Sequence, residues 1–101
     1  MNFVQTISFT SSRMDEMQKL MDDFGNENLA DQASRGFVKS QVLKDRDREN
    51  GYVVVAEFAS YDQAMANSAR PETDAFAKKM GELCDGPPTF GNYDVVNEET
   101  P

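Results

Sequence analysis

The sequence predicts an α+β fold, in which a four-stranded antiparallel sheet carries two helices on one face. Residues 2–10 and 52–58 show the two-residue alternation of side chains that is typical of strands. The charged segment 45–51 ends in an Asn-Gly pair between two strand patterns, which indicates a hairpin. Two longer stretches have apolar residues at helical spacing. The predicted order is therefore strand, helix, strand, strand, helix, strand.

The first strand is predicted over residues 2–10. Its odd-numbered side chains point to one side of the sheet and its even-numbered ones to the other. The odd-numbered set is Phe3, Gln5, Ile7 and Phe9, which is mostly apolar, and the even-numbered set is mixed. The strand therefore has one face suited to a core.

The first helix is predicted to begin after Ser11 or Ser12, whose hydroxyl groups can act as N-caps. A stripe of apolar residues follows at helical spacing: Met14, Met17, Leu20, Met21 and Phe24. Methionine-rich stripes also occur on adaptable binding surfaces, but the core-facing interpretation is simpler. We expect the helix to stop near residues 24–28, with Gly25 as its left-handed cap, and residues 29–35 to form an irregular connection.

The two middle strands are predicted over residues 36–45 and 52–58, joined by the hairpin and therefore antiparallel neighbours. In the second of them, one face carries Tyr52, Val54, Ala56 and Phe58, and the other carries Val53, Val55 and Glu57. Because both faces are largely apolar, we expect a central strand that is covered on both sides.

The second helical region is predicted in two pieces. Ser60 and Gln63 have the spacing of a capping box, and Pro71 suits the first position of a new piece. The inward stripe of that piece is Phe76, Ala77, Met80, Leu83 and Cys84. Gly86 is expected to end the helix. The last strand is predicted over residues 90–96.

Composition excludes several classes of function. The chain has 101 residues and a net charge of −8, and its basic residues near the hairpin alternate with acidic ones, which argues against nucleic-acid binding. It has no histidine, so histidine-dependent triads, histidine-ligated haem and the common zinc sites are not expected. The single cysteine, Cys84, is interpreted as a core residue. With neither a signal peptide nor a membrane-length apolar run, we expect a cytoplasmic protein.

The predicted order is that of the ferredoxin-like βαββαβ fold. We expect one domain over residues 1–97, followed by a loose tail over residues 98–101. Two helices can cover only one face of such a sheet, which leaves side chains such as Val53 and Val55 exposed on the other. A patch of that size is unusual on a monomer, so we expect a homodimer formed through the sheet faces.

Four segments carry a resemblance to a known family: the strand 52–58, the run Ala59-Ser60-Tyr61-Asp62-Gln63-Ala64-Met65, the turn Asn67-Ser68-Ala69-Arg70-Pro71-Glu72-Thr73, and the closing strand 90–96. With these segments the chain resembles the dimeric α/β-barrel superfamily, and within it is most similar to antibiotic-biosynthesis-monooxygenase-like domains. The resemblance implies that dioxygen oxidises a hydroxylated aromatic substrate inside the barrel, without a metal or a flavin. The tryptophan and histidine that such sites use are absent here.

Three residues are candidates for a catalytic site: Asn67, Tyr61 and Glu57. Asn67 can orient a ligand oxygen, although Asn67 and Ser68 can equally be the end of the first helical piece. Tyr61 can stack on an aromatic ring or pack as a staple residue. Glu57, the one charge in its strand, is a candidate base, or else a partner of Lys39 on the neighbouring strand.

Two residues are candidates for ligand binding: Arg70 and Tyr93. Arg70 can hold an anion, or it can pair with Glu72 or Asp74 at the surface. Tyr93 can contact an aromatic ligand or fill the barrel or the interface. No metal site and no cofactor are expected.

Two functions of different class remain open at this point. One is a cofactor-independent monooxygenase acting on a small aromatic molecule, and the other is a non-catalytic dimeric module that binds a ligand or a partner. The sheet face of Val53 and Val55 distinguishes them, because large side chains that meet there across the dimer would close a cavity, whereas small ones such as Ser8, Ser40 and Gly91 would leave it open. Both kinds of residue are candidates for this face, so the sequence leaves the choice open.

Overall fold

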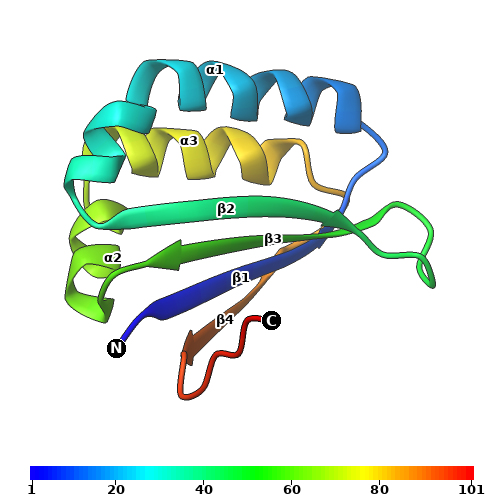
Figure 1. Ribbon diagram of the computed structural model, residues 1–101. Coiled ribbons are helices and arrows are strands. Elements are labelled where there is room, and N and C mark those ends of the chain that lie inside the picture. The colour runs from blue at the N-terminus through cyan, green and yellow to red at the C-terminus, as the bar shows by residue number, and fades with distance from the viewer.

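The sheet contains four antiparallel strands in the order β2-β3-β1-β4, as the computed structural model of residues 1–101 shows (Figure 1). Its elements are β1 (Phe3–Thr10), α1 (Met14–Ser34), β2 (Phe37–Lys44), β3 (Gly51–Phe58), α2 (Tyr61–Ser68), α3 (Pro71–Glu82) and β4 (Thr89–Asp94). The ferredoxin-like fold that the sequence predicts is therefore confirmed, with the second helical region divided at Pro71 as expected.

Helices α1 and α3 lie side by side over one face of the sheet, and α2 lies at the end of the sheet where β1 begins (Figure 1). Helix α1 contacts β2 and α3, while α2 contacts β3. The opposite face of the sheet carries no helix (Figure 1). No helix is long and apolar enough to cross a membrane.

The core consists of two small clusters between the helices and the sheet. The first contains Phe3, Phe58 and Ala64, close to α2. The second contains Phe9, Met17 and Met80, and joins β1 to α1 and α3. Phe3 pairs with Phe58 and Phe9 with Tyr52 across the central strands, so the odd-numbered residues of β1 face the helices as predicted. The Met17 side chain is fully buried, which confirms the core-facing interpretation of the methionine stripe.

Helix α1 is longer than the sequence pattern predicted. It continues through residues 25–28 to Ser34, so the irregular connection expected over residues 29–35 is wrong. Gly25 lies inside the helix, and the left-handed backbone conformation belongs to Gly36, which has a φ of 95°. Residues 29–34 contain no proline or glycine, and an ion pair from Arg35 to Asp31 (3.3 Å) supports their last turn.

The two predicted caps have different outcomes. Ser60 caps α2, because its hydroxyl oxygen accepts a hydrogen bond from the backbone N–H of Gln63 (3.2 Å). By contrast, the residue that precedes α1 is Arg13, so neither Ser11 nor Ser12 is its N-cap. Ser11 is buried and accepts a hydrogen bond from the Arg13 N–H (3.1 Å) while donating one to the Leu83 carbonyl oxygen (2.7 Å). It thus ties the start of α1 to the end of α3.

A bulge in β2 changes which residues share a face. Phe37 pairs with Phe58, but Lys39 already pairs with the next residue of β3, Glu57, so Val38 is the extra residue. Beyond the bulge, Ser40 pairs with Ala56 and faces the helices. The expectation that Ser40 lies on the Val53 face is therefore wrong.

The last strand runs from Thr89 to Asp94, one residue earlier at its start and two residues shorter at its end than predicted. The Val95 N–H still donates to the Asn2 carbonyl oxygen (2.9 Å), which holds the chain beside β1 for one residue beyond the strand. Residues 97–101 belong to no helix or strand.

The extended α1 leads to a test with two alanine substitutions. Gly36→Ala should lower the free energy of unfolding by about 1 kcal/mol or more, because alanine is strained at positive φ. Its Cβ would also lie only 2.5 Å from the side chain of Gln63. Gly25→Ala should raise the free energy of unfolding by roughly 0.5–1 kcal/mol, because its Cβ meets no atom within 4 Å and alanine favours a helix interior. Urea unfolding measures both, and destabilisation by Gly25→Ala would contradict the continuous helix.

Candidate functional site

A cavity of about 580 Å³ lies between the helical layer and the sheet, between the two core clusters. Of its 23 lining residues 13 are hydrophobic, so its walls suit an apolar molecule. The sheet contributes Ile7, Val54 and Phe58, and α1 and α3 contribute Met21, Phe24 and Phe76 among others. This cavity is therefore on the helical face of the sheet, opposite to the face of Val53 and Val55.

Two aromatic rings join the helices above this cavity. Phe24 of α1 and Phe76 of α3 are stacked, with 4.5 Å between ring centroids and 29° between ring planes. Both rings line the cavity. They hold the two helices together while the smaller side chains Ser40 and Ala56 on the sheet below leave space. An aromatic ligand would thus meet aromatic side chains on the helical side.

Asn67 is the sequence-predicted candidate that lines the cavity. It lies in the last turn of α2, and only 9% of its surface is exposed. Its backbone carbonyl accepts a hydrogen bond from the Arg70 N–H (3.2 Å), but its side-chain amide makes no hydrogen bond within the protein. The residue as a whole is buried, but its amide atoms are not among the side-chain atoms shielded from solvent, so the amide is accessible to a ligand in the cavity.

Gln5 is a second amide in the cavity, and it is not among the candidates predicted from the sequence. Its Nε2 donates to Asn92 Oδ1 on β4 at 3.4 Å, and the residue lies on the floor of the cavity. The signal was present in the sequence, because Gln5 is the one polar residue on the apolar face of the first strand. Such a side chain faces the space between sheet and helices, where a polar group needs a partner.

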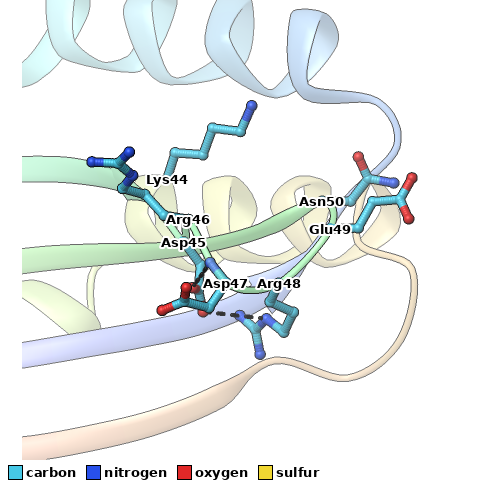
Figure 2. A pocket seen from close by; sticks show the side chains of 7 residues that line it. All are labelled: Lys44, Asp45, Arg46, Asp47, Arg48, Glu49 and Asn50. Atoms are coloured by element: carbon cyan, nitrogen blue, oxygen red, sulfur yellow. Dashed lines mark hydrogen bonds and ion pairs between the residues drawn. The ribbon is translucent and has the colours of Figure 1, made fainter.

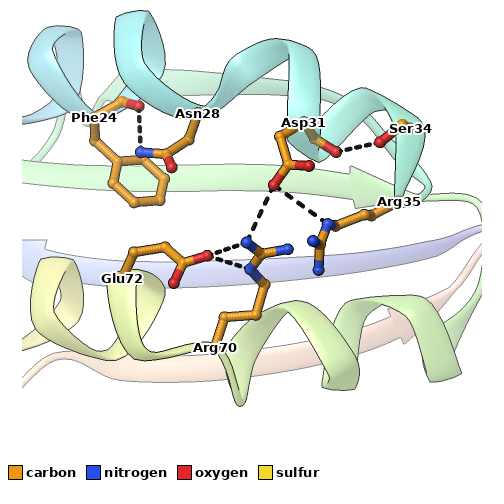
Figure 3. Close-up of polar contacts among 7 residues, drawn as sticks. All are labelled: Phe24, Asn28, Asp31, Ser34, Arg35, Arg70 and Glu72. Carbon is orange, nitrogen blue, oxygen red and sulfur yellow. Dashed lines mark hydrogen bonds and ion pairs between the residues drawn. The ribbon is translucent and has the colours of Figure 1, made fainter.

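Arg70 does not line the cavity. Its guanidinium group forms ion pairs with Glu72 and with Asp31 of α1 (3.1 Å for Asp31), and Arg35 binds the same Asp31 carboxylate (Figure 3). The predicted surface pairing with Glu72 is therefore present. Arg70 Nη1 is buried and has no hydrogen-bond partner. The residue joins the second half of α1 to the junction of α2 and α3.

The other three candidates lie away from the cavity. Tyr61 is 53% exposed at the start of α2 and packs edge-on against Phe3, with ring centroids 5.2 Å apart. Tyr93 lies on the open sheet face, where its ring covers Gly91 so closely that a Cβ there would meet it at 2.7 Å. Glu57 is on the same face and accepts a hydrogen bond from Asn2 Nδ2 (2.8 Å). Glu57 is opposite Lys39 in the strand register but forms no ion pair with it.

A second hollow, at the β2–β3 hairpin, has a different character. It is formed by residues 44–50, none of which is hydrophobic (Figure 2). Figure 2 shows that the side chains of Lys44, Arg46 and Glu49 point away from one another. Arg48 instead turns back, pairing with Asp45 (3.7 Å) and donating to the Phe9 carbonyl oxygen (3.3 Å). The hollow is thus a solvated hairpin tip, as the alternation of charges predicted.

Cys84 behaves as a core residue. It packs beside the cluster of Phe9, Met17 and Met80, and its thiol donates to the Met80 carbonyl oxygen at 3.3 Å. Burial raises the pKa of the Cys84 thiol, and the nearby Asp85 adds to the increase. The reactive thiolate is therefore disfavoured. No group of three or more Cys, Asp or Glu side chains is placed to hold a metal ion.

The cavity and the one-sided helical layer define the class: a ferredoxin-like α+β protein with a small-molecule-sized cavity between its layers. Among solved structures, the chain is similar to a proposed antibiotic biosynthesis monooxygenase from Caulobacter crescentus, with a TM-score of 0.81 and 19% identity over 95% of this chain and 91% of the other. It is also similar to SnoaB, a cofactor-independent oxygenase from Streptomyces nogalater (TM-score 0.76, 21% identity, 96% and 95% covered).

A third similar structure is Rv0793 from Mycobacterium tuberculosis, with a TM-score of 0.78 and 14% identity over 99% of this chain and all of the other. No protein-family profile matches the chain, and no curated protein matches its sequence. The structures therefore show that this chain has the fold of the antibiotic-biosynthesis-monooxygenase-like proteins, which confirms the fold expected from the resemblance.

The ion pairs around Arg70 lead to a prediction about acid. The pKa of Glu72 is lowered first by its own backbone N–H and then by the side chain of Arg70. Glu72 thus stabilises the fold above its ordinary pKa of 4.5, and this contribution is lost as the pH falls through the lower value of the folded state. The difference in free energy of unfolding between the native protein and Glu72→Gln should therefore shrink below about pH 4.5. Urea titrations at several pH values test this, and a difference independent of pH would contradict it.

Proposed function

We propose that the protein binds a small hydroxylated aromatic molecule in the cavity between helices and sheet, and oxidises it with dioxygen. The observation that carries this proposal is Asn67, a residue that is only 9% exposed and lines the cavity, and whose side-chain amide is accessible and has no hydrogen-bond partner in the protein. An apolar cavity holds an aromatic body, and a buried amide holds an oxygen atom of defined position. The similarity in fold to SnoaB, a cofactor-independent oxygenase, supports this choice of chemistry.

The proposed reaction converts a phenol with an unsubstituted ortho or para carbon into the corresponding ortho- or para-quinone. The substrate loses the phenolic proton and the hydrogen on that carbon, and it supplies four electrons to dioxygen. One oxygen atom becomes the new carbonyl group, and the other leaves as water with the two hydrogens, so atoms and electrons balance. No residue of the protein needs to change its oxidation state.

The role proposed for Asn67 is to donate its amide N–H to the phenolic oxygen as negative charge develops there. A preorganised neutral donor stabilises such a charge best where little water is present, and the hydrophobic residues around Asn67 in the cavity lining favour that condition once a ligand is bound. The side-chain carbonyl oxygen of Gln5 can accept a hydrogen bond from the hydroxyl group of the undissociated phenol, since its Nε2 group already donates to Asn92. Both amides are placed by rigid elements, α2 and β1.

The alternative function is a module that binds such a molecule without changing it. The observation that favours it is the position of Tyr61, Tyr93, Glu57 and Arg70, none of which lines the cavity. Only Asn67 among the candidates remains near a bound ligand, and one amide binds an oxygen atom without moving a proton. Both functions use the same cavity.

Replacing Asn67 tests the site. Asn67→Ala should weaken binding of a naphthol by about three- to tenfold, because one hydrogen bond is lost. Asn26→Ala, on the exposed side of α1 and outside the cavity, is the matched control and should leave binding unchanged. Fluorescence titration measures binding, and an oxygen electrode with quinone absorbance measures turnover. Binding without oxygen consumption favours the non-catalytic module, whereas equal affinity of Asn67→Ala and the native protein contradicts the proposed site.

We also propose that two copies of the chain associate through the sheet face that no helix covers. This face carries Val4, Val53 and Val55 in its centre, with Leu43 46% exposed and Tyr93 58% exposed beside them. Exposed apolar side chains gathered on one face favour association, because each square ångström of apolar surface that is buried stabilises the complex by about 25 cal/mol.

Val55→Lys tests this association. It places a charge in the centre of the proposed interface, so the variant should be a monomer or should aggregate. Val96→Lys is the control, because Val96 is 85% exposed and lies beyond the end of β4. Light scattering coupled to size-exclusion chromatography distinguishes the outcomes. A stable dimer of Val55→Lys would show that another surface forms the contact.

A further inference from the structure

The charged side chains that line the cavity are all negative. They are Asp22 of α1 and Asp74 of α3, and no lysine or arginine is among the lining residues. Both aspartates are largely exposed although they line the cavity, so they stand where it meets the solvent. Each covering helix thus contributes one carboxylate to the exposed rim of the cavity.

Neither carboxylate is strongly neutralised. Asp22 accepts a hydrogen bond from the neutral amide of Gln18 (3.0 Å), which leaves its charge in place. Asp74 pairs with Lys78 at 3.1 Å, but the two side chains are 60% and 75% exposed, and such exposed pairs are weak. The negative potential of these groups therefore remains available to a charge on the ligand, and the net charge of −8 adds to it.

Arg70 does not offset this potential inside the cavity. Of its two predicted roles, holding an anion or pairing at the surface, the structure shows the second, because Asp31 and Glu72 both bind its guanidinium group (Figure 3). The remaining nitrogen of the guanidinium group, Nη1, is inaccessible to solvent, and Arg70 is not among the residues that line the cavity. The cavity thus offers an anion no positive partner.

From these charges we infer that the cavity selects an aromatic ligand that carries a basic amine, and that it disfavours carboxylated aromatic molecules. The inference rests on the proposed function, because it assigns the class of ligand to the same cavity. The aromatic body lies between Phe24, Phe76 and the sheet, the hydroxyl group meets Asn67, and the ammonium group remains at the mouth near Asp22 and Asp74. A second, independent observation points to a ligand here, namely the unpartnered amide of Asn67.

Three phenols of one shape test the inference: tyramine, para-ethylphenol and para-hydroxyphenylacetate, which are positive, neutral and negative at neutral pH. We expect tyramine to bind about tenfold more tightly than para-hydroxyphenylacetate at low salt, with para-ethylphenol between them. The ratio should decrease as salt is added, because both aspartates are exposed to screening. Titration followed by NMR chemical shifts of the cavity residues measures all three affinities, even when they are weak.

A pair of double variants separates the cavity charges from the overall charge. Asp22→Asn with Asp74→Asn should reduce the ratio to near one. The matched control is Asp23→Asn with Glu82→Gln. It also removes one negative charge from α1 and one from α3, but at positions outside the cavity, and it should keep most of the preference for tyramine. Equal binding of the three phenols to the native protein, or an equal loss of preference in both double variants, would overturn the inference.

The failure of the inference is distinguishable from the failure of the proposed function. If para-ethylphenol shifts the resonances of Asn67 and its neighbours but charge has no effect, only the charge selection is wrong. If none of the three phenols shifts them, the proposed function itself is contradicted. The comparison within the native protein needs no variant, so it does not depend on how the substitutions affect folding.

Discussion

The distance between the helical layer and the sheet depends on how the two ends of α1 are held. At its start, the buried hydroxyl group of Ser11 joins the Arg13 N–H to the Leu83 carbonyl oxygen. Toward its other end, Arg70 binds Asp31 and anchors the helix to the junction of α2 and α3. Between these two attachments Met17 packs into a core cluster, and Met21 and Phe24 line the cavity without filling it.

The central contacts explain why the helices do not close this space. The two core clusters are small and lie at opposite ends of the β1–β3 pair, where large side chains such as Phe3 and Phe9 are buried. In the middle, β1 presents Gln5, and β2 and β3 present Ser40 and Ala56, all of which are shorter or polar. Close packing at both ends and small side chains between them give a cavity with firm walls.

The order of elements and the buried face of β1 could be predicted from the sequence, because alternation of side chains and helical spacing are local patterns. The length of α1 could not, since Gly25 is typical of a helix end, whereas the helix continues to Ser34 and its Asp31 contacts Arg70, a residue distant in the sequence. The face on which Ser40 lies depends on a bulge at Val38, which no residue type in that strand signals. Which side of the sheet holds the cavity depends on how the helices pack on the sheet, and this packing is not visible in the sequence. Of the five candidate residues, only Asn67 therefore proved to line the cavity.

The bulge at Val38 has a consequence for how copies of this protein can meet. Strand β2 is an edge of the sheet, and an edge strand with free backbone groups can pair with the edge of another copy. The bulge interrupts the regular spacing of those groups, and the charged side chains of Lys39 and Lys44 are exposed along the same strand. Extension of the sheet from one molecule into the next is thereby discouraged at this edge. The same irregularity that turns Ser40 toward the cavity therefore also protects the protein against fibrous aggregation.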